Sequence, residues 1–239
     1  MKNNSRIILA IAGLALAALA CQAATGAATD TPVAPIDTGV PGNPTESQPS
    51  GGDVILIDDF SSARWGTGTD ADSSVEYANE ALQMIVYSTN YFVWSTPNDQ
   101  DYQNVHMEVT VLNNDTDSTT AFGLMCNQQA ASDSSFYYFA MTPAGEYAIA
   151  KAEAGQTDIF LTNNDEWAVS DLIARNASSY RVGADCGNGT LTLYVDAQQV
   201  ASVSDSSYTD GGVAVFTWSG EEATTTDVFF DDFVMRELP

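Results

Sequence analysis

The chain has 239 residues, of which 44% are hydrophobic, so it is long enough to form one domain with a large core. It carries 32 acidic residues against seven basic ones, a formal net charge of −25. Such a charge repels phosphate backbones and anionic lipid surfaces, which argues against nucleic-acid binding. The acidic residues are scattered rather than gathered in runs, as on a solvated, mutually repelling surface.

The segment from Met1 to Cys21 has the pattern of an export signal. Lys2 and Arg6 give a positive start, and residues 7–20 form an unbroken apolar run. A run of roughly 14 residues is too short to cross a bilayer core, which needs about 20. It has the length of a secretory h-region.

The end of this segment resembles the lipobox of bacterial lipoproteins. Residues 18–21 read Ala-Leu-Ala-Cys, and the usual lipobox has Leu where this chain has Ala18. The resemblance implies that diacylglycerol alkylates Cys21, which becomes the N-terminus after cleavage. The protein is then anchored to the outer face of a bacterial membrane. The alternative is ordinary secretion, with cleavage near Ala20 or Ala24.

Residues 22–52 are predicted to be a disordered tether. The segment holds five of the eight prolines, mixed with Ala, Thr, Gly and Ser, and it has no aromatic residue. It cannot bury enough apolar surface to offset the loss of chain entropy. A coil of this length reaches roughly 30 Å on average, which would lift a domain clear of the membrane. Gln22 follows the cysteine, which favours the outer membrane if the organism has one.

Residues 53–239 are predicted to form a single all-β domain. Apolar and polar residues alternate over 82–87 and 105–112, the period of a strand with one buried and one exposed face. The only histidine, His106, falls on the exposed side of the second pattern. The apolar runs 122–125 and 136–139 are predicted to be central, more fully buried strands. Turn signals separate roughly a dozen short strands, which indicates a sandwich or a barrel.

The cysteine count predicts one disulfide. With Cys21 assigned to lipid, Cys126 and Cys186 remain, and outside the cytoplasm two such cysteines usually pair. Closing a loop of about 60 residues would stabilise the fold by roughly 4 kcal/mol on the chain-entropy model. A redox or metal pair is the alternative, but the chain has no C-x-x-C motif.

The order of several short phrases resembles that of a known superfamily. They are Ile57-Asp58-Asp59-Phe60, Phe122-Gly123-Leu124-Met125-Cys126, Phe136-Tyr137-Tyr138-Phe139, Asp185-Cys186-Gly187-Asn188-Gly189 and Phe230-Asp231-Asp232-Phe233. Together they resemble the concanavalin A-like lectin/glucanase superfamily, and more narrowly the LamG-like jelly-roll domains of bacterial lipoproteins. The resemblance spans nearly all of 53–239. It implies a two-sheet antiparallel jelly-roll sandwich, a cysteine pair, and a concave face where sugars often bind.

Catalytic residues of the superfamily's glucanases are not matched. Those enzymes place two glutamates on one strand, about 5 Å apart, as nucleophile and acid. Here Glu108 has no partner on its strand, and Glu221 and Glu222 are adjacent, so a strand would point them to opposite faces. A single histidine supports no Ser-His-Asp arrangement. We therefore expect a non-catalytic domain, with a divergent glycoside hydrolase as one alternative.

Two aspartate pairs are candidate ligands of a structural calcium ion. Asp58-Asp59 and Asp231-Asp232 lie on the predicted terminal strands, which should be neighbours in a jelly roll. Calcium binds several oxygens, many of them from carboxylates. The resemblance also implies such an ion, because many concanavalin A-like folds carry calcium near the chain ends. The alternative is that one acid of each pair faces water and the other caps a turn or bonds to backbone.

Three aromatic residues are candidate sugar contacts. Tyr91 and Trp94 lie near a predicted sheet rim, and Trp218 precedes the loop 219–226. Sugar C–H faces stack on such rings, so an exposed row would form a binding platform. Trp65 and Trp167 are predicted to be structural, because large aromatics in a sandwich are more often core.

These features predict a surface-anchored bacterial lipoprotein whose domain binds a glycan without catalysis. The membrane is expected as a partner only through the lipid. The second alternative is a structural or adhesive envelope protein that binds another protein.

Overall fold

The computed structural model describes residues 52–114, 119–130, 134–221 and 225–239. The chain divides into two units, residues 1–43 and 44–239, and all described residues belong to the second. The predicted signal segment, Cys21 and all but the last residue of the tether lie outside the described residues. The described part contains no helix long and apolar enough to span a membrane.

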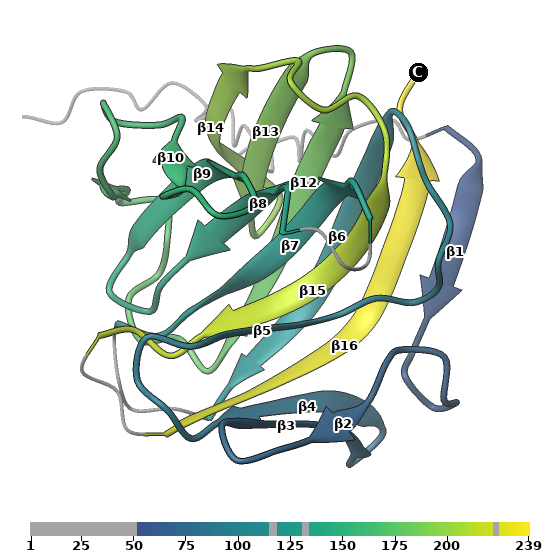
Figure 1. Cartoon of the computed structure of the whole chain (residues 1–239), viewed down its shortest axis with the longest axis vertical. Helices are drawn as coiled ribbons and strands as arrows, with labels where there is room; N and C mark the ends of the chain where they lie inside the picture. The colour runs from purple at the N-terminus through teal and green to yellow at the C-terminus, as the bar shows by residue number, and fades with distance from the viewer. Residues whose placement is uncertain (1–51, 115–118, 131–133, 222–224) are drawn as a thin grey trace, which may run out of the picture. The chain divides into compact units, whose positions relative to one another are not determined.

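Every regular element of the described part is a β-strand, and the strands form two antiparallel sheets (Figure 1). The nine-stranded sheet contains β1 (Val54–Asp58), β2 (Gly68–Thr69), β3 (Ser73–Ala78), β4 (Ala81–Val86), β6 (Val105–Asn113), β12 (Ser179–Gly187), β13 (Thr190–Val195), β14 (Gln198–Ser204) and β16 (Thr226–Glu237). Its order is β14-β13-β12-β6-β16-β4-β3-β2, with β1 also paired to β16.

The second sheet has seven strands. They are β5 (Phe92–Ser95), β7 (Ala121–Gln128), β8 (Phe136–Met141), β9 (Glu146–Ala152), β10 (Ile159–Phe160), β11 (Ala168–Val169) and β15 (Gly212–Trp218). Their order is β10-β9-β8-β7-β15-β5, with β11 paired to β9. The predicted two-sheet antiparallel jelly roll is therefore confirmed.

The main core lies between the sheets, and the period-two pattern explains its composition. Leu82, Met84 and Val86 on β4 are fully buried, as the alternation predicted. Strands β7 and β8 are buried at every position, as their unbroken apolar runs indicated. The side chains of β7 and β8 that point away from the main core belong to a separate apolar cluster on the outer side of the seven-stranded sheet.

The predicted disulfide joins the two sheets. Cys126 on β7 is bonded to Cys186 on β12, and both side chains are buried in the main core. The two cysteines are 60 residues apart in sequence. The bridge therefore links two distant strands that face each other across the sandwich.

The terminal strands are neighbours, as expected, with Asp58 of β1 opposite Phe233 of β16. A bulge interrupts β16 after Asp231, and Asp232 adopts a left-handed backbone with φ of 50°. Phe60 is also left-handed, with φ of 53°, and its side chain is buried.

Both Asp-Asp-Phe phrases bury their phenylalanine against one tryptophan. The ring centroids of Phe60 and Phe233 lie 5.2 and 5.0 Å from that of Trp65, which is 3% exposed. The structural role predicted for Trp65 is confirmed. The two phrases thus build one buried aromatic contact beside the paired terminal strands.

Candidate functional site: an aromatic groove

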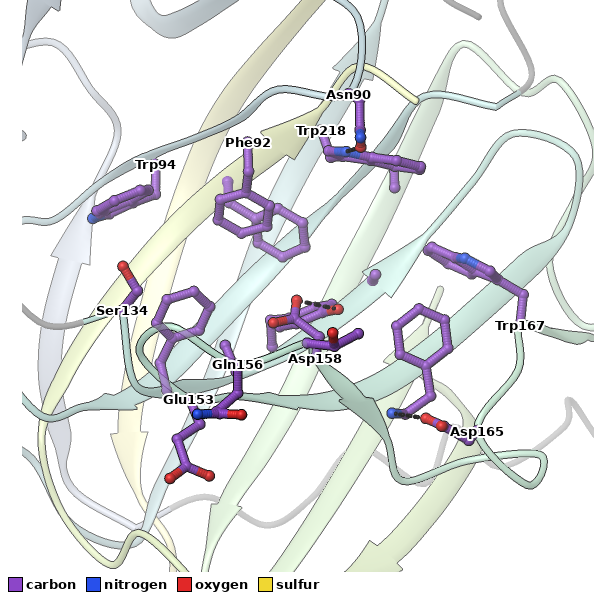
Figure 2. A pocket seen from close by; sticks show the side chains of 18 of the residues that line it. Asn90, Phe92, Trp94, Ser134, Glu153, Gln156, Asp158, Asp165, Trp167 and Trp218 are labelled. Atoms are coloured by element: carbon purple, nitrogen blue, oxygen red, sulfur yellow. Dashed lines mark hydrogen bonds between the residues drawn. The ribbon is translucent and has the colours of Figure 1, made fainter. Parts of the chain in front are cut away.

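A groove of about 700 Å³ lies on the outer face of the seven-stranded sheet (Figure 2). Every second side chain of a strand points to one face, so residues on the outer face of β5, β7, β8, β9, β10 and β15 line it. The lining strand residues are Phe92, Trp94, Ala121, Phe136, Tyr138, Ala140, Ala152, Phe160, Phe216 and Trp218. Alanines on β7, β8 and β9 leave space between larger side chains, which accounts for the hollow.

Packed rings make up one part of the groove. The rings of Phe92 and Phe216 stack with centroids 4.6 Å apart and planes 16° apart. Phe92 also lies 5.9 Å from both Phe136 and Tyr138, measured between centroids. Trp94 packs at the end of this group and remains 36% exposed. These mutual contacts restrict the orientation of the rings, and the indole of Trp94 stays partly exposed to solvent.

A second aromatic group lines the groove near Trp218. The Nε1 of Trp218 donates a hydrogen bond of 3.1 Å to Oδ1 of Asn90, which fixes the indole orientation. Trp167 lies nearly parallel to Trp218, with centroids 6.4 Å apart, and Phe160 contacts Trp167 edge-on at 5.4 Å. Figure 2 shows Trp94 and Trp167 on opposite sides of the view.

Among the described residues, four carboxylates line the groove, and all of them come from segments between strands. They are Glu153, Asp158, Asp165 and Glu221. The hydroxyl of Tyr138 donates a hydrogen bond of 3.0 Å to Oδ2 of Asp158. Loss of hydration raises the pKa of Asp158, although the bond from Tyr138 opposes this. Burial, and then the charge of Asp158, raises the pKa of the Tyr138 hydroxyl.

The structure brings two of the three predicted sugar contacts together in this groove. Trp94 and Trp218 line it, whereas Tyr91 does not. Tyr91 precedes β5, and its backbone N–H and C=O bond to Ser219. Phe92 lies in the groove instead, because it shares the face of Trp94 two residues later. That alternation was the signal that could have identified Phe92.

Trp167 was predicted to be structural but lines the groove. It lies outside the strands, in the segment before β11, where alternation gives no sidedness, and it also packs against the outer apolar cluster, so lining the groove does not exclude the structural role. Sequence reasoning also missed Phe136, Tyr138 and Phe216. Phe136 and Tyr138 were assigned to a central, buried strand, and Phe216 was assigned to neither face; all three pack in the outer cluster rather than the main core.

The predicted calcium ligands occupy turns and a bulge at the chain ends. Asp58 is buried, and its carboxylate accepts bonds from the N–H of Phe60 and the indole of Trp65, at 2.9 and 3.3 Å. The Nε of Arg64 lies 3.3 Å from Oδ2 of Asp58. Asp58 therefore fits the alternative in which one aspartate of the pair bonds to backbone instead of to calcium.

Of the other three aspartates, Asp59 and Asp232 are exposed and Asp231 is half-buried. Asp59 accepts a bond from Ser61 N–H, and Asp231 accepts one from Asp232 N–H. The described residues include no group of three or more His, Cys, Asp or Glu side chains placed to hold a metal ion. The calcium ion stays a prediction.

Glu108 and His106 lie on the nine-stranded sheet, away from the groove. His106 is 4% exposed, so its predicted place on an exposed face was wrong. The polar face of β6 is covered here, because Asp185 and Tyr194 from neighbouring strands pack against the imidazole. Glu108 pairs with His106 and with Arg181, whose Nη2 lies 3.1 Å from Oε2.

Comparison with known proteins supports the architecture. No protein-family model matches the chain, and no curated protein matches it. Among solved structures, carbohydrate-binding module CBM66 from Bacillus subtilis is 14% identical, with a TM-score of 0.56 over 73% of this chain and 96% of that one. The fold is that of the concanavalin A-like jelly rolls.

Two further structures have the same architecture. A Bacillus licheniformis β-glucanase is 13% identical, with a TM-score of 0.54, covering 80% of this chain and 100% of the other. A Bacillus subtilis protein of unknown function with a galectin-like fold is 9% identical, with a TM-score of 0.57, covering 78% and 97%. A binding module and a hydrolase both occur among these neighbours, and identities this low establish the fold alone.

Proposed function

We propose that this domain binds a carbohydrate in the aromatic groove and does not cleave it. The observation that carries the proposal is the lining itself, in which eight aromatic side chains of the described residues line one groove, five of them at least partly exposed and Phe136, Tyr138 and Phe216 packed beneath them. They are Phe92, Trp94, Phe136, Tyr138, Phe160, Trp167, Phe216 and Trp218. The C–H faces of a sugar ring stack on such surfaces, and rings fixed by mutual contacts lose little entropy on binding. Carbohydrate-binding and carbohydrate-cleaving neighbours of the same fold support this kind of ligand.

The non-catalytic part of the proposal is supported by where the carboxylates lie. A retaining glycosidase holds two carboxyl groups about 5 Å apart across the scissile bond. In the described part of the chain, none of the strand residues that line this groove is acidic. The strand residues that line the groove offer aromatic and methyl surface, which suits binding of a ligand rather than proton transfer to it.

The N-terminal sequence supports presentation of the domain outside the cell. Lipidation of Cys21 would hold the protein at a bacterial membrane, and residues 22–52 would act as a spacer. With Lys2 and Arg6 removed, five basic residues remain against 32 acidic ones, a net charge of about −27. That charge keeps the domain away from anionic lipid, so the anchor rather than the surface would make the membrane contact.

A glycan array with groove variants tests the proposal. Trp94→Ala and Trp218→Ala should each weaken binding by about tenfold or more, since each removes a stacking surface. Tyr87→Ala is a matched control, because Tyr87 is exposed and does not line the groove. Glycan binding that both groove variants retain would contradict the proposal. A co-purifying protein released by Trp218→Ala, with no glycan signal, would instead support the adhesive alternative.

A divergent hydrolase is a second candidate because of Asp158. Its carboxyl lies in the groove, bonds to Tyr138 and has a raised pKa, which is the condition of a general acid. Release of new reducing ends from a polysaccharide panel would reveal such an activity. The binding proposal predicts none from the parent protein. Turnover that Asp158→Asn abolishes would establish the hydrolase instead.

A further inference from the structure

The groove is lined by acidic side chains and by no basic side chain among the described residues. Glu153, Asp158, Asp165 and Glu221 line it. We propose that the groove selects glycans that carry free amino groups, such as chains of deacetylated hexosamine, over neutral and acidic glycans. This inference rests on the proposed carbohydrate binding and specifies its ligand class.

Three of the five basic residues of the domain are engaged elsewhere, and the other two, Arg175 and Arg236, do not line the groove. Arg64 lies against Asp58 at the chain ends, and Arg181 pairs with Glu108 on the other sheet. The Nζ of Lys151 donates to Oγ of Ser207, outside the groove. Uronate, sulfate or sialate groups would therefore meet four carboxylates, with no compensating cation among the described residues that line the groove. Coulomb repulsion makes acidic glycans unfavourable ligands.

Three of the four carboxylates, those of Asp158, Glu153 and Glu221, have capacity left for an ammonium group. Tyr138 bonds to Oδ2 of Asp158, and within the described part of the chain nothing donates a hydrogen bond to Oδ1. Glu153 and Glu221 form no ion pair with any described residue. Asp165 is less available, because its Oδ1 accepts the backbone N–H of Phe160 at 2.7 Å.

The aromatic lining favours the same ligand charge. The face of an aromatic ring is the negative end of its quadrupole, so a cation within about 6 Å of the ring centre is attracted. Figure 2 shows Asp158 in the middle of the view, with Trp94 on one side and Trp167 on the other. An ammonium group held near Asp158 would meet both a carboxylate and ring faces. An acetylated amine keeps the stacking surface but loses the charge.

Three oligosaccharides with one backbone test the inference. They are β-1,4-linked hexamers of glucosamine, N-acetylglucosamine and glucose, titrated calorimetrically into the full chain below the pKa of the amines. At low salt the glucosamine hexamer should bind at least about tenfold more tightly than the other two. In about 0.5 M sodium chloride the difference should shrink several-fold, because salt screens charge but not stacking.

Charge-neutral variants assign the preference to named carboxylates. Asp158→Asn keeps an oxygen for the Tyr138 hydroxyl, and it is combined with Glu153→Gln. The double variant should lose most of the preference for glucosamine while still binding the neutral hexamers. Glu76→Gln is the matched control, because Glu76 is an exposed carboxylate on the nine-stranded sheet. It should keep the full preference.

The outcomes separate the two proposals. Equal binding of all three hexamers, lost in Trp218→Ala, would overturn the charge selection and leave carbohydrate binding intact. A glucosamine preference that survives in Asp158→Asn/Glu153→Gln, or that falls equally in Glu76→Gln, would show that the preference comes from the net charge of the protein and not from the groove carboxylates. No binding of any hexamer or array glycan would overturn both proposals.

Discussion

The Nδ1 of His106 lies 2.6 Å from Oδ1 of Asp185, and its Nε2 lies 3.3 Å from Oε1 of Glu108. Both ring nitrogens therefore face a carboxylate, an arrangement that requires a doubly protonated imidazolium. Arg181 and Tyr194 complete the cluster, the first bound to Glu108 and the second donating to Asp185. Burial alone would lower the pKa of His106, but the hydrogen bonds and charges of the two carboxylates outweigh it and raise this pKa to about 9.

The contacts of His106 with Asp185 and Glu108 predict a loss of stability at alkaline pH. A histidine whose pKa rises from 6.5 in the unfolded chain to about 9 in the fold stabilises the protein fully below pH 6.5. That contribution, about 2 kcal/mol after allowance for solvent screening, is lost as pH rises through 9. Unfolding free energies from pH 6 to 10 should fall in the parent and stay nearly level in His106→Gln.

Proton NMR checks the same prediction directly. The chain has one histidine, so its imidazole resonance needs no assignment among others. The expected midpoint of its titration is about pH 9. A midpoint near the ordinary value of 6.5 would show that the two carboxylates do not hold the proton.

The disulfide predicts a second effect on stability. Cys126→Ala combined with Cys186→Ala should lower the unfolding free energy by about 2–5 kcal/mol, because the bridge closes a long loop and lies in the core. Denaturant titrations of the bridged and doubly substituted proteins measure the difference, both in a Cys21→Ser background. Thiol titration of the unfolded, unreduced protein is the control. Two reactive thiols there would contradict the bridge.

The fold was predictable because its evidence is local. The alternation in β4 and β6 identifies the residues that face the main core, and a strand shows this pattern without its partners. It does not identify His106 as buried, because the neighbouring side chains that cover His106 come from other strands. The groove was harder, because in residues 136–139 all four side chains are apolar. Alternation cannot then tell which pair faces the main core. The register decides: Tyr137 lies opposite Cys126 and faces the core with it, whereas Tyr138 lies opposite Met125 and faces outward.

Lipidation of Cys21 gives a third prediction. Cys21→Ser should move the protein from the membrane to the soluble fraction, because the thiol is the only predicted attachment point. Detergent phase separation of parent and variant measures this in a bacterial host that processes lipoproteins. Gln22→Ala is a control that leaves the cysteine in place and should remain membrane-bound. Identical partitioning of parent and Cys21→Ser would make the N-terminal segment an ordinary secretion signal.

The aspartates at the chain ends give the last prediction. Loss of hydration, and then the charges of Asp232, Asp59 and Glu80, raise the pKa of Asp231, so these carboxylates repel one another. A calcium ion among them would relieve that repulsion and link β1 to β16. Asp58 is a poorer ligand than Asp59, because its carboxylate already bonds to backbone and indole.

Calcium at about 100 times its Kd should raise the unfolding free energy by roughly 2.7 kcal/mol, since it binds the folded state alone. Sodium at matched ionic strength should stabilise less, because it screens charge without bridging the strands. Melting curves in chelator, calcium and sodium separate the two effects. Asp59→Asn/Asp231→Asn should abolish the calcium increment, while Glu76→Gln, on β3, should keep it. Equal melting temperatures in the two salts would show that these aspartates bind no calcium.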